Sequence, residues 1–169
     1  MADDPSHRTG NGAGARRQPV DAVDLAILRA LRDDGRMTVT QLAHEVNVSR
    51  ANAYTRLDRL RETGVIEGYG VRVNARAIGL EVTALILLTA EQGRWRELMA
   101  KLLEIPEIEF IGIATGDFDV AVLVRTTSTD ELRDVVLERF HALPEVKSSR
   151  TVLLLDDVAR GPIIPGAQP

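Results

Sequence analysis

The spacing of hydrophobic positions changes near residue 80 of this 169-residue chain. Before that point apolar residues recur every three or four positions, which is the period of an amphipathic helix. After it, apolar runs that are typical of strands alternate with two further helical patterns. The sequence therefore predicts a helical first part and a mixed second part.

The first part predicts three short helices. Each begins at a residue whose side chain can accept a hydrogen bond from a free amide of the first turn, namely Asp21, Thr38 and Ser49. A glutamine three residues after Thr38 completes a capping box, and Gly64 is a typical stop signal for the third helix. Residues 65–73 follow as two short predicted strands folded over a glycine-containing turn. Three helices and this strand pair predict a winged helix-turn-helix.

The second part predicts four strands and two helices in the order βαββαβ. This order is that of a split βαβ unit with a ferredoxin-like sandwich architecture. The whole chain is therefore predicted to be an α+β protein, with an N-terminal winged helix-turn-helix followed by a ferredoxin-like βαββαβ sandwich. The expected strands are 82–90, 108–115, 120–126 and 146–155, and the expected helices are 94–103 and 129–142.

The composition of the two ends and of the junction suggests five segments. The N-terminal stretch is rich in glycine and charged residues and has no hydrophobic period, which is typical of a disordered arm. The expected segments are a disordered arm at 1–19, the winged helix-turn-helix domain at 20–73, a hinge at 74–81, the ferredoxin-like domain at 82–158 and a tail at 159–169.

The charge is distributed unevenly along the chain. The net charge is −4, but residues 77–169 carry nine basic against fifteen acidic side chains, so the acid lies in the second half. DNA binding needs a local basic face rather than a basic whole, so the total charge does not exclude it. No apolar run approaches the roughly 20 residues that span a bilayer, and there is no apolar secretory segment at the start. We therefore expect no membrane partner and a cytoplasmic location.

The third predicted helix carries side chains that are suited to reading DNA. Its apolar stripe of Ala53, Leu57 and Leu60 turns inward, so its polar residues face elsewhere. Arginine and asparagine offer paired donors to guanine and adenine edges, and a capped helix N-terminus suits a phosphate. A solvated face explains these charges equally well, but the capping box, the short turn, the spacing and the strand pair together favour double-stranded DNA. The expected DNA-binding residues are Thr38, Ser49, Arg50, Asn52, Tyr54, Arg56 and Arg59.

The order of these motifs resembles that of the Lrp/AsnC family, the feast/famine transcription regulators. The resemblance covers residues 21 to about 158 and rests on DAVDLAILRALRDDGRMTVTQLAHEVNVS, RLDRLRETGVIEGY and TGDFD. It implies a DNA-binding head and a regulatory domain that forms homodimers through its sheet and assembles further, often to octamers. It also implies an amino acid or a related small metabolite as effector. Asp58 departs from the family pattern by placing an acid on the recognition helix, where it could pair with Arg61.

The segment IATGDFDVAVLV, residues 113–124, joins two predicted strands through a loop with one glycine and two aspartates. Backbone amides freed by glycine suit a carboxylate, and an aspartate suits an ammonium group, so the loop offers partners for both ends of an amino acid. Gly-Asp pairs are also common turn formers, which is the plainer explanation. The resemblance implies an effector site formed by Thr115, Gly116, Asp117 and Asp119, with Ile113, Ala114 and Thr151 as further lining.

An enzyme is the alternative function. The same two-domain order resembles the sirohaem decarboxylases, which need basic and histidine side chains in a cleft. The three histidines, His7, His44 and His141, fall outside the predicted cleft loops. We find no phosphate-binding loop, no GxGxxG and no histidine pair at metal-ligand spacing. A DNA-binding regulator with no catalytic residues, no cofactor and no metal is therefore the preferred prediction.

Overall fold

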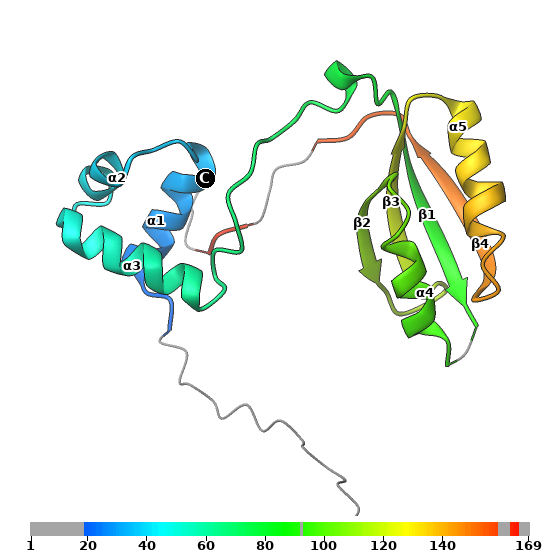
Figure 1. Ribbon diagram of the computed structural model, residues 1–169, viewed down its shortest axis with the longest axis horizontal. Helices are drawn as coiled ribbons and strands as arrows, with labels where there is room; N and C mark the ends of the chain where they lie inside the picture. The colour runs from blue at the N-terminus through cyan, green and yellow to red at the C-terminus, as the bar shows by residue number, and fades with distance from the viewer. Residues whose placement is uncertain (1–18, 92, 159–162, 166–169) are drawn as a thin grey trace, which may run out of the picture. The chain divides into compact units, whose positions relative to one another are not determined.

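The computed structural model describes residues 19–91, 93–158 and 163–165 (Figure 1). The chain divides into two compact units, residues 1–71 with 161–169 and residues 72–160, and each is described by itself. The predicted disordered arm falls almost wholly outside the described residues, as does most of the predicted tail. Among the residues that are described, no helix is long and apolar enough to cross a membrane.

The first unit contains the three predicted helices, α1 (Ala22–Asp33), α2 (Val39–Glu45) and α3 (Arg50–Glu62). The predicted caps form: Asp21, Thr38 and Ser49 each accept a hydrogen bond from a backbone amide of the first turn. The short connection from α2 to α3 passes through Asn47, whose φ of 54° is left-handed. One side chain or more from each helix builds the core, which consists of Ile27, Leu42, Leu57 and Leu60.

The two short strands that we expected over residues 65–73 do not form. The backbone after α3 leaves the helix at Gly64, with φ of 71°, and then runs without regular secondary structure as far as residue 74. Glycines at 68 and 70 weaken a strand, and most of the apolar side chains here are exposed, including Tyr69, Val71 and Val73. An isolated two-stranded hairpin is marginal without a surface to pack on, which accounts for the difference.

The second unit is the predicted βαββαβ domain. Its strands are β1 (Val82–Ala90), β2 (Ile108–Ile113), β3 (Val120–Thr126) and β4 (Val146–Leu154). They form one antiparallel sheet in the order β2-β3-β1-β4, so the two central strands are first and third in the chain. Helix α4 (Trp95–Leu102) follows β1, and α5 (Thr129–Asp134) follows β3 and continues as the π-helix η2 (Val135–Phe140). The helix expected over 129–142 is thus present, but its second half has a wider winding than predicted.

The helices cover one face of the sheet. Alternate residues of the central strands, such as Ile86 of β1 and Val122 of β3, are fully buried against Leu98 of α4 and Phe140 of η2. Residues of the opposite parity point to the other face, which no described element of this unit covers. The segment expected as a hinge at 74–81 contains a 3₁₀ turn, η1 (Arg76–Ile78), that ends at Gly79 with φ of 88°.

Candidate functional site

The outward face of α3 is the first candidate site. The buried stripe of Ala53, Leu57 and Leu60 packs inward, so the opposite side of the helix is open to solvent. Arg50 lies over the ring of Tyr54, with 5.7 Å between the guanidinium carbon and the ring centroid. This contact holds a cation at the N-terminal end of the exposed face, in the part of a recognition helix that contacts base edges.

Two of the predicted DNA-binding residues, Arg56 and Arg59, are engaged inside the protein. Arg56 Nη1 lies 2.7 Å from Asp21 Oδ2 and 2.8 Å from Asp24 Oδ1, and Arg59 Nη2 lies 2.5 Å from Asp24 Oδ2. Asp24 is fully buried, whereas both arginines retain about a fifth of their side-chain exposure. These arginines therefore tie α3 to the start of α1. Sequence periodicity placed them off the apolar stripe but could not show that α1 supplies their counter-ions.

The carboxylates of this network are held in their charged form. Burial raises the pKa of the Asp24 carboxyl, but the hydrogen bonds from the Asp21 amide and from Arg59 and Arg56 outweigh it, so the pKa lies below its usual range. The amide of Asp24 and the guanidinium of Arg56 likewise lower the pKa of Asp21. A reciprocal capping box joins the two aspartates, with Asp24 N donating to Asp21 Oδ1 at 2.8 Å and Asp21 N donating to Asp24 Oδ2 at 3.0 Å.

The other five predicted DNA-binding residues are exposed. Ser49 and Thr38 also serve as caps, and Asn52 Oδ1 accepts a hydrogen bond from Arg56 Nε at 2.7 Å, so part of their hydrogen-bonding capacity is used within the protein. The exposed face of α3 also includes residues that the prediction omitted. They belong to this face because they lie opposite the buried stripe or beside it. These additional exposed residues of α3 are Ala51, Thr55, Asp58, Arg61 and Glu62.

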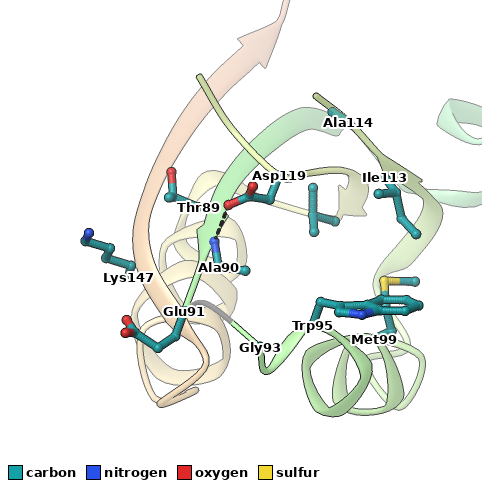
Figure 2. A pocket seen from close by; sticks show the side chains of 11 residues that line it. Thr89, Ala90, Glu91, Gly93, Trp95, Met99, Ile113, Ala114, Asp119 and Lys147 are labelled. Atoms are coloured by element: carbon teal, nitrogen blue, oxygen red, sulfur yellow. Dashed lines mark hydrogen bonds between the residues drawn. The ribbon is translucent and has the colours of Figure 1, made fainter. Parts of the chain in front are cut away.

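A pocket of about 780 Å³ in the second unit is the second candidate site (Figure 2). It lies where the end of β1, the start of α4 and the end of β2 come together. Trp95 and Met99 lie together at one end of the view, and Glu91 and Lys147 lie at the other. The pocket thus combines an apolar part with two opposite charges, and its volume is typical of small-molecule sites.

The loop between β2 and β3 is fastened to β1 beside this pocket. Asp119 Oδ2 accepts a hydrogen bond from the backbone amide of Ala90 at 2.8 Å (Figure 2). Asp119 N also donates to the Leu88 carbonyl at 2.9 Å. The Asp119 carbonyl in turn accepts from Ala114 N at 2.8 Å, and Gly116 has a φ of 125° that favours glycine. This aspartate therefore shapes the loop and supplies one wall of the pocket.

The structure brings together only some of the residues expected to bind an effector. Ile113, Ala114 and Asp119 line the pocket, whereas Thr115, Gly116, Asp117 and Thr151 are exposed and do not line it. Apart from Thr151, the prediction followed the β2–β3 loop, so it missed the residues that β1 and α4 contribute and Lys147 of β4. The pocket is also lined by residues that were not predicted to bind an effector, namely Thr89, Ala90, Glu91, Gly93, Trp95, Met99, Val120 and Lys147.

The face of the sheet opposite the helices carries a row of apolar side chains. Leu85 of β1 pairs with Leu123 of β3 and with Val152 of β4, so three aliphatic side chains lie in one row. Phe110 of β2 extends the row, and it is 57% exposed, with Val152 40% exposed. At one end Arg125 pairs with Glu109 and with Asp157, whose Oδ2 lies 2.7 Å from Arg125 Nη2. We call this surface the open sheet face.

Two family models match the chain. The family described as winged helix-turn-helix DNA-binding matches residues 20–67, and the Lrp/AsnC ligand binding domain matches residues 83–164. An uncharacterized HTH-type transcriptional regulator of Pyrococcus abyssi is 32% identical over 142 residues, which cover 84% of this chain and 90% of that protein. The chain belongs to the Lrp/AsnC family.

Further Lrp/AsnC regulators support this assignment. The proline dehydrogenase transcriptional activator of Rhizobium radiobacter is 32% identical over 142 residues, covering 82% of this chain and 91% of that one. The solved feast or famine regulatory protein from M. tuberculosis, complexed with L-methionine, is 29% identical with a TM-score of 0.80, covering 87% of this chain and 100% of that one. The predicted fold class and the predicted DNA-binding transcription regulator are thus confirmed.

The comparisons do not favour the alternative of a sirohaem-decarboxylase-like enzyme, because the matched relatives are transcription regulators. Within the described part of the chain, neither His44 nor His141 lines the pocket beside Trp95. His44 is exposed on α2, and His141 Nε2 lies 2.8 Å from Ser149 Oγ. His7 lies outside the described residues.

Proposed function

We propose that this Lrp/AsnC regulator binds double-stranded DNA through the exposed face of α3 and binds a small apolar amino acid in the pocket beside Trp95. The observation that carries the effector half is the composition of the pocket, with an indole and a thioether at one end and two opposite charges at the other. We further propose that the chain assembles through its open sheet face. The relatives named above come from bacteria and an archaeon, where DNA lies in the cytoplasm, and we propose that this protein acts there.

The pocket offers a partner for each part of an amino acid. The ammonium of Lys147 suits an α-carboxylate, and the carboxylate of Glu91 suits an α-ammonium group. Trp95, Met99 and Ile113 provide an apolar surface for the ligand side chain. The relative from M. tuberculosis was solved as a complex with L-methionine, which makes this amino acid the first probe to use.

Ligand binding can be followed directly, because Trp95 is the single tryptophan of the chain. We expect L-methionine and L-leucine to change the fluorescence of Trp95 in a saturable way, and L-glutamate and D-methionine to have little effect. Replacing Lys147 by alanine is expected to weaken binding about tenfold, since a charged hydrogen bond contributes roughly 1.5–3 kcal/mol. The measurement is a fluorescence titration, confirmed by calorimetry.

The matched control for Lys147→Ala is Arg133→Ala. Arg133 is an exposed cation of the same domain that pairs with Asp130 and Asp134 on α5, and it does not line the pocket. Its removal should leave the titration unchanged. Equal weakening in both variants, or no saturable signal with any apolar amino acid, would contradict the proposed effector site.

We expect Arg50 to make a large contribution to the free energy of DNA binding. Its guanidinium is held over Tyr54 at the N-terminal end of α3, so little side-chain freedom is lost on binding. Arg50→Ala is expected to weaken binding to the preferred DNA site by about 1–3 kcal/mol without changing the thermal midpoint of unfolding. The measurement is fluorescence anisotropy at several salt concentrations, together with thermal unfolding.

The control for Arg50→Ala is Arg133→Ala, which removes a cation from the other unit. It should leave both DNA affinity and its salt dependence unchanged. If Arg50→Ala binds the preferred site as tightly as the wild type does, α3 does not bind DNA in the proposed way.

The two proposed activities are coupled only if ligand binding changes the assembly or the arrangement of the DNA-binding units. Linkage then requires that DNA changes the affinity for the amino acid by the same factor as the amino acid changes the affinity for DNA. Titrating Trp95 fluorescence with and without the DNA site measures that factor.

A further inference from the structure

We propose that Asp58 is a specificity-determining residue of α3, which selects a cytosine in each DNA half-site by accepting a hydrogen bond from its amino group. The inference rests on the proposed function, because it assumes that the exposed face of α3 enters the major groove. Helix α3 carries four arginines and two acids, and Asp58 is the acid nearer to its N-terminus.

Asp58 lies on the side of α3 that faces away from the core. Ala53, Leu57 and Leu60 are buried, and a helix rotates by about 100° per residue, so positions 51, 55, 58 and 62 lie roughly opposite that stripe. All four of these positions are exposed. Asp58 therefore projects toward whatever surface the helix meets.

The carboxylate of Asp58 has no ion pair or hydrogen bond among the interactions found in the described part of the chain. The pairing with Arg61 that the sequence suggested is not formed. Arg56 and Arg59 are engaged with Asp21 and Asp24 at the start of α1. Asp58 thus retains its full capacity as an acceptor. It is not a structural counter-ion for the helix.

An unpaired carboxylate on a DNA-binding surface is unfavourable next to phosphates, unless a base supplies a donor. In the major groove, guanine offers only acceptors at N7 and O6, and thymine offers an acceptor and a methyl group. Adenine offers an amino group beside the acceptor N7, which would repel the carboxylate. Cytosine offers its N4 amino group without such an acceptor, so it is the base that a carboxylate prefers.

The reach along the helix is sufficient for such a contact. Asp58 lies nine positions after the Ser49 cap, which corresponds to about 13.5 Å along the helix axis. That length spans about four base-pair steps when a helix lies along the groove. The N-terminal residues Arg50 and Tyr54 would then contact one end of the half-site, and Asp58 would contact the other.

The test is selection of preferred sequences from a randomised double-stranded DNA library by the full-length protein at one salt concentration. We compare the wild type with Asp58→Asn and with Glu62→Gln, which removes the same charge one turn further along the same exposed face. The wild type is expected to enrich a two-fold symmetric motif with one C·G pair per half-site that Asp58→Asn no longer enriches. For this variant, replacing that C·G pair should cost less than twofold in affinity, against about tenfold in the wild type.

The control separates base recognition from charge. Both substitutions remove a negative charge near phosphates, so both should raise affinity for unrelated DNA by about two- to fivefold. Only Asp58→Asn should change the motif. If Asp58→Asn enriches the same motif as the wild type, or if both variants change it equally, Asp58 does not select a base and the inference is wrong.

Failure of the proposed function gives a different result. A wild-type protein that enriches no motif at all would overturn both the DNA-binding proposal and the inference on Asp58. If the wild type enriches a motif and Asp58→Asn enriches the same motif, only the inference on Asp58 is overturned, and the DNA-binding proposal stands.

Discussion

Replacing Asp24 by asparagine is expected to lower the free energy of unfolding of the helical unit by about 2 kcal/mol at pH 7. The substitution keeps the size of the side chain and an oxygen that can accept from the Asp21 amide, but it removes the charge that Arg56 and Arg59 face. Asp24 is fully buried, so water cannot replace the carboxylate. The two arginines are partly exposed and can turn toward solvent, which limits the loss.

The effect of Asp24→Asn should depend on pH in a defined direction. The folded protein holds the pKa of Asp24 below its ordinary value, so its contribution to stability is complete above the unfolded pKa of about 3.9. That contribution is lost as the pH falls through the lower folded value. The difference between wild type and variant should therefore be constant from about pH 5 to 7 and shrink below about pH 4.

Urea unfolding followed by circular dichroism at pH 7 and near pH 3 measures this difference, and amide hydrogen exchange in α3 assigns it to the helical unit. The matched control is Asp33→Asn on the same helix, because Asp33 is exposed and pairs only with the adjacent Arg32 among the described residues. This control should change stability by less than about 0.5 kcal/mol at either pH. A variant at Asp24 as stable as the control would show that the buried network contributes nothing net.

The same network shows what the sequence could not supply. Periodicity correctly placed Ala53, Leu57 and Leu60 inside and left Arg56 and Arg59 outside the core. It could not show that the start of α1, more than thirty residues away in the chain, brings two carboxylates to those arginines. Local pattern determines which face a residue occupies, whereas its partners depend on tertiary packing.

The proposed effector site illustrates the same limit at one end of the sheet. The loop from Ile113 to Asp119 was recognised because glycine and aspartate give a strong local signal, and three of its residues do line the pocket. The indole of Trp95 and the ammonium of Lys147 join them only because the strand order β2-β3-β1-β4 and the position of α4 bring distant segments together. Helices and strands with strong caps or strong apolar runs were predicted closely, while the glycine-containing stretch after α3 was not.

The open sheet face leads to the prediction with the largest effect. A sheet that is covered by helices on one side still needs a cover for an apolar second side. Leu85, Leu123 and Val152 form a row across the three strands, and Phe110 extends it. A contiguous apolar surface that is open to solvent marks an interaction site, and a second copy of the same sheet offers a matching surface.

Replacing Leu85 by aspartate is therefore expected to convert the proposed dimer into monomers at micromolar concentration. A two-fold interface contains the substitution twice, so two uncompensated carboxylates would have to be buried in each dimer, at a cost of several kcal/mol. The monomer should stay folded, because Leu85 points away from the helix-covered core that includes Ala84 and Ile86. Sedimentation velocity over a concentration series measures the change, with Leu103→Asp as the control at an exposed leucine after α4. A Leu85→Asp protein that still sediments as the wild type does, with unchanged circular dichroism, would show that this face is not where the subunits meet.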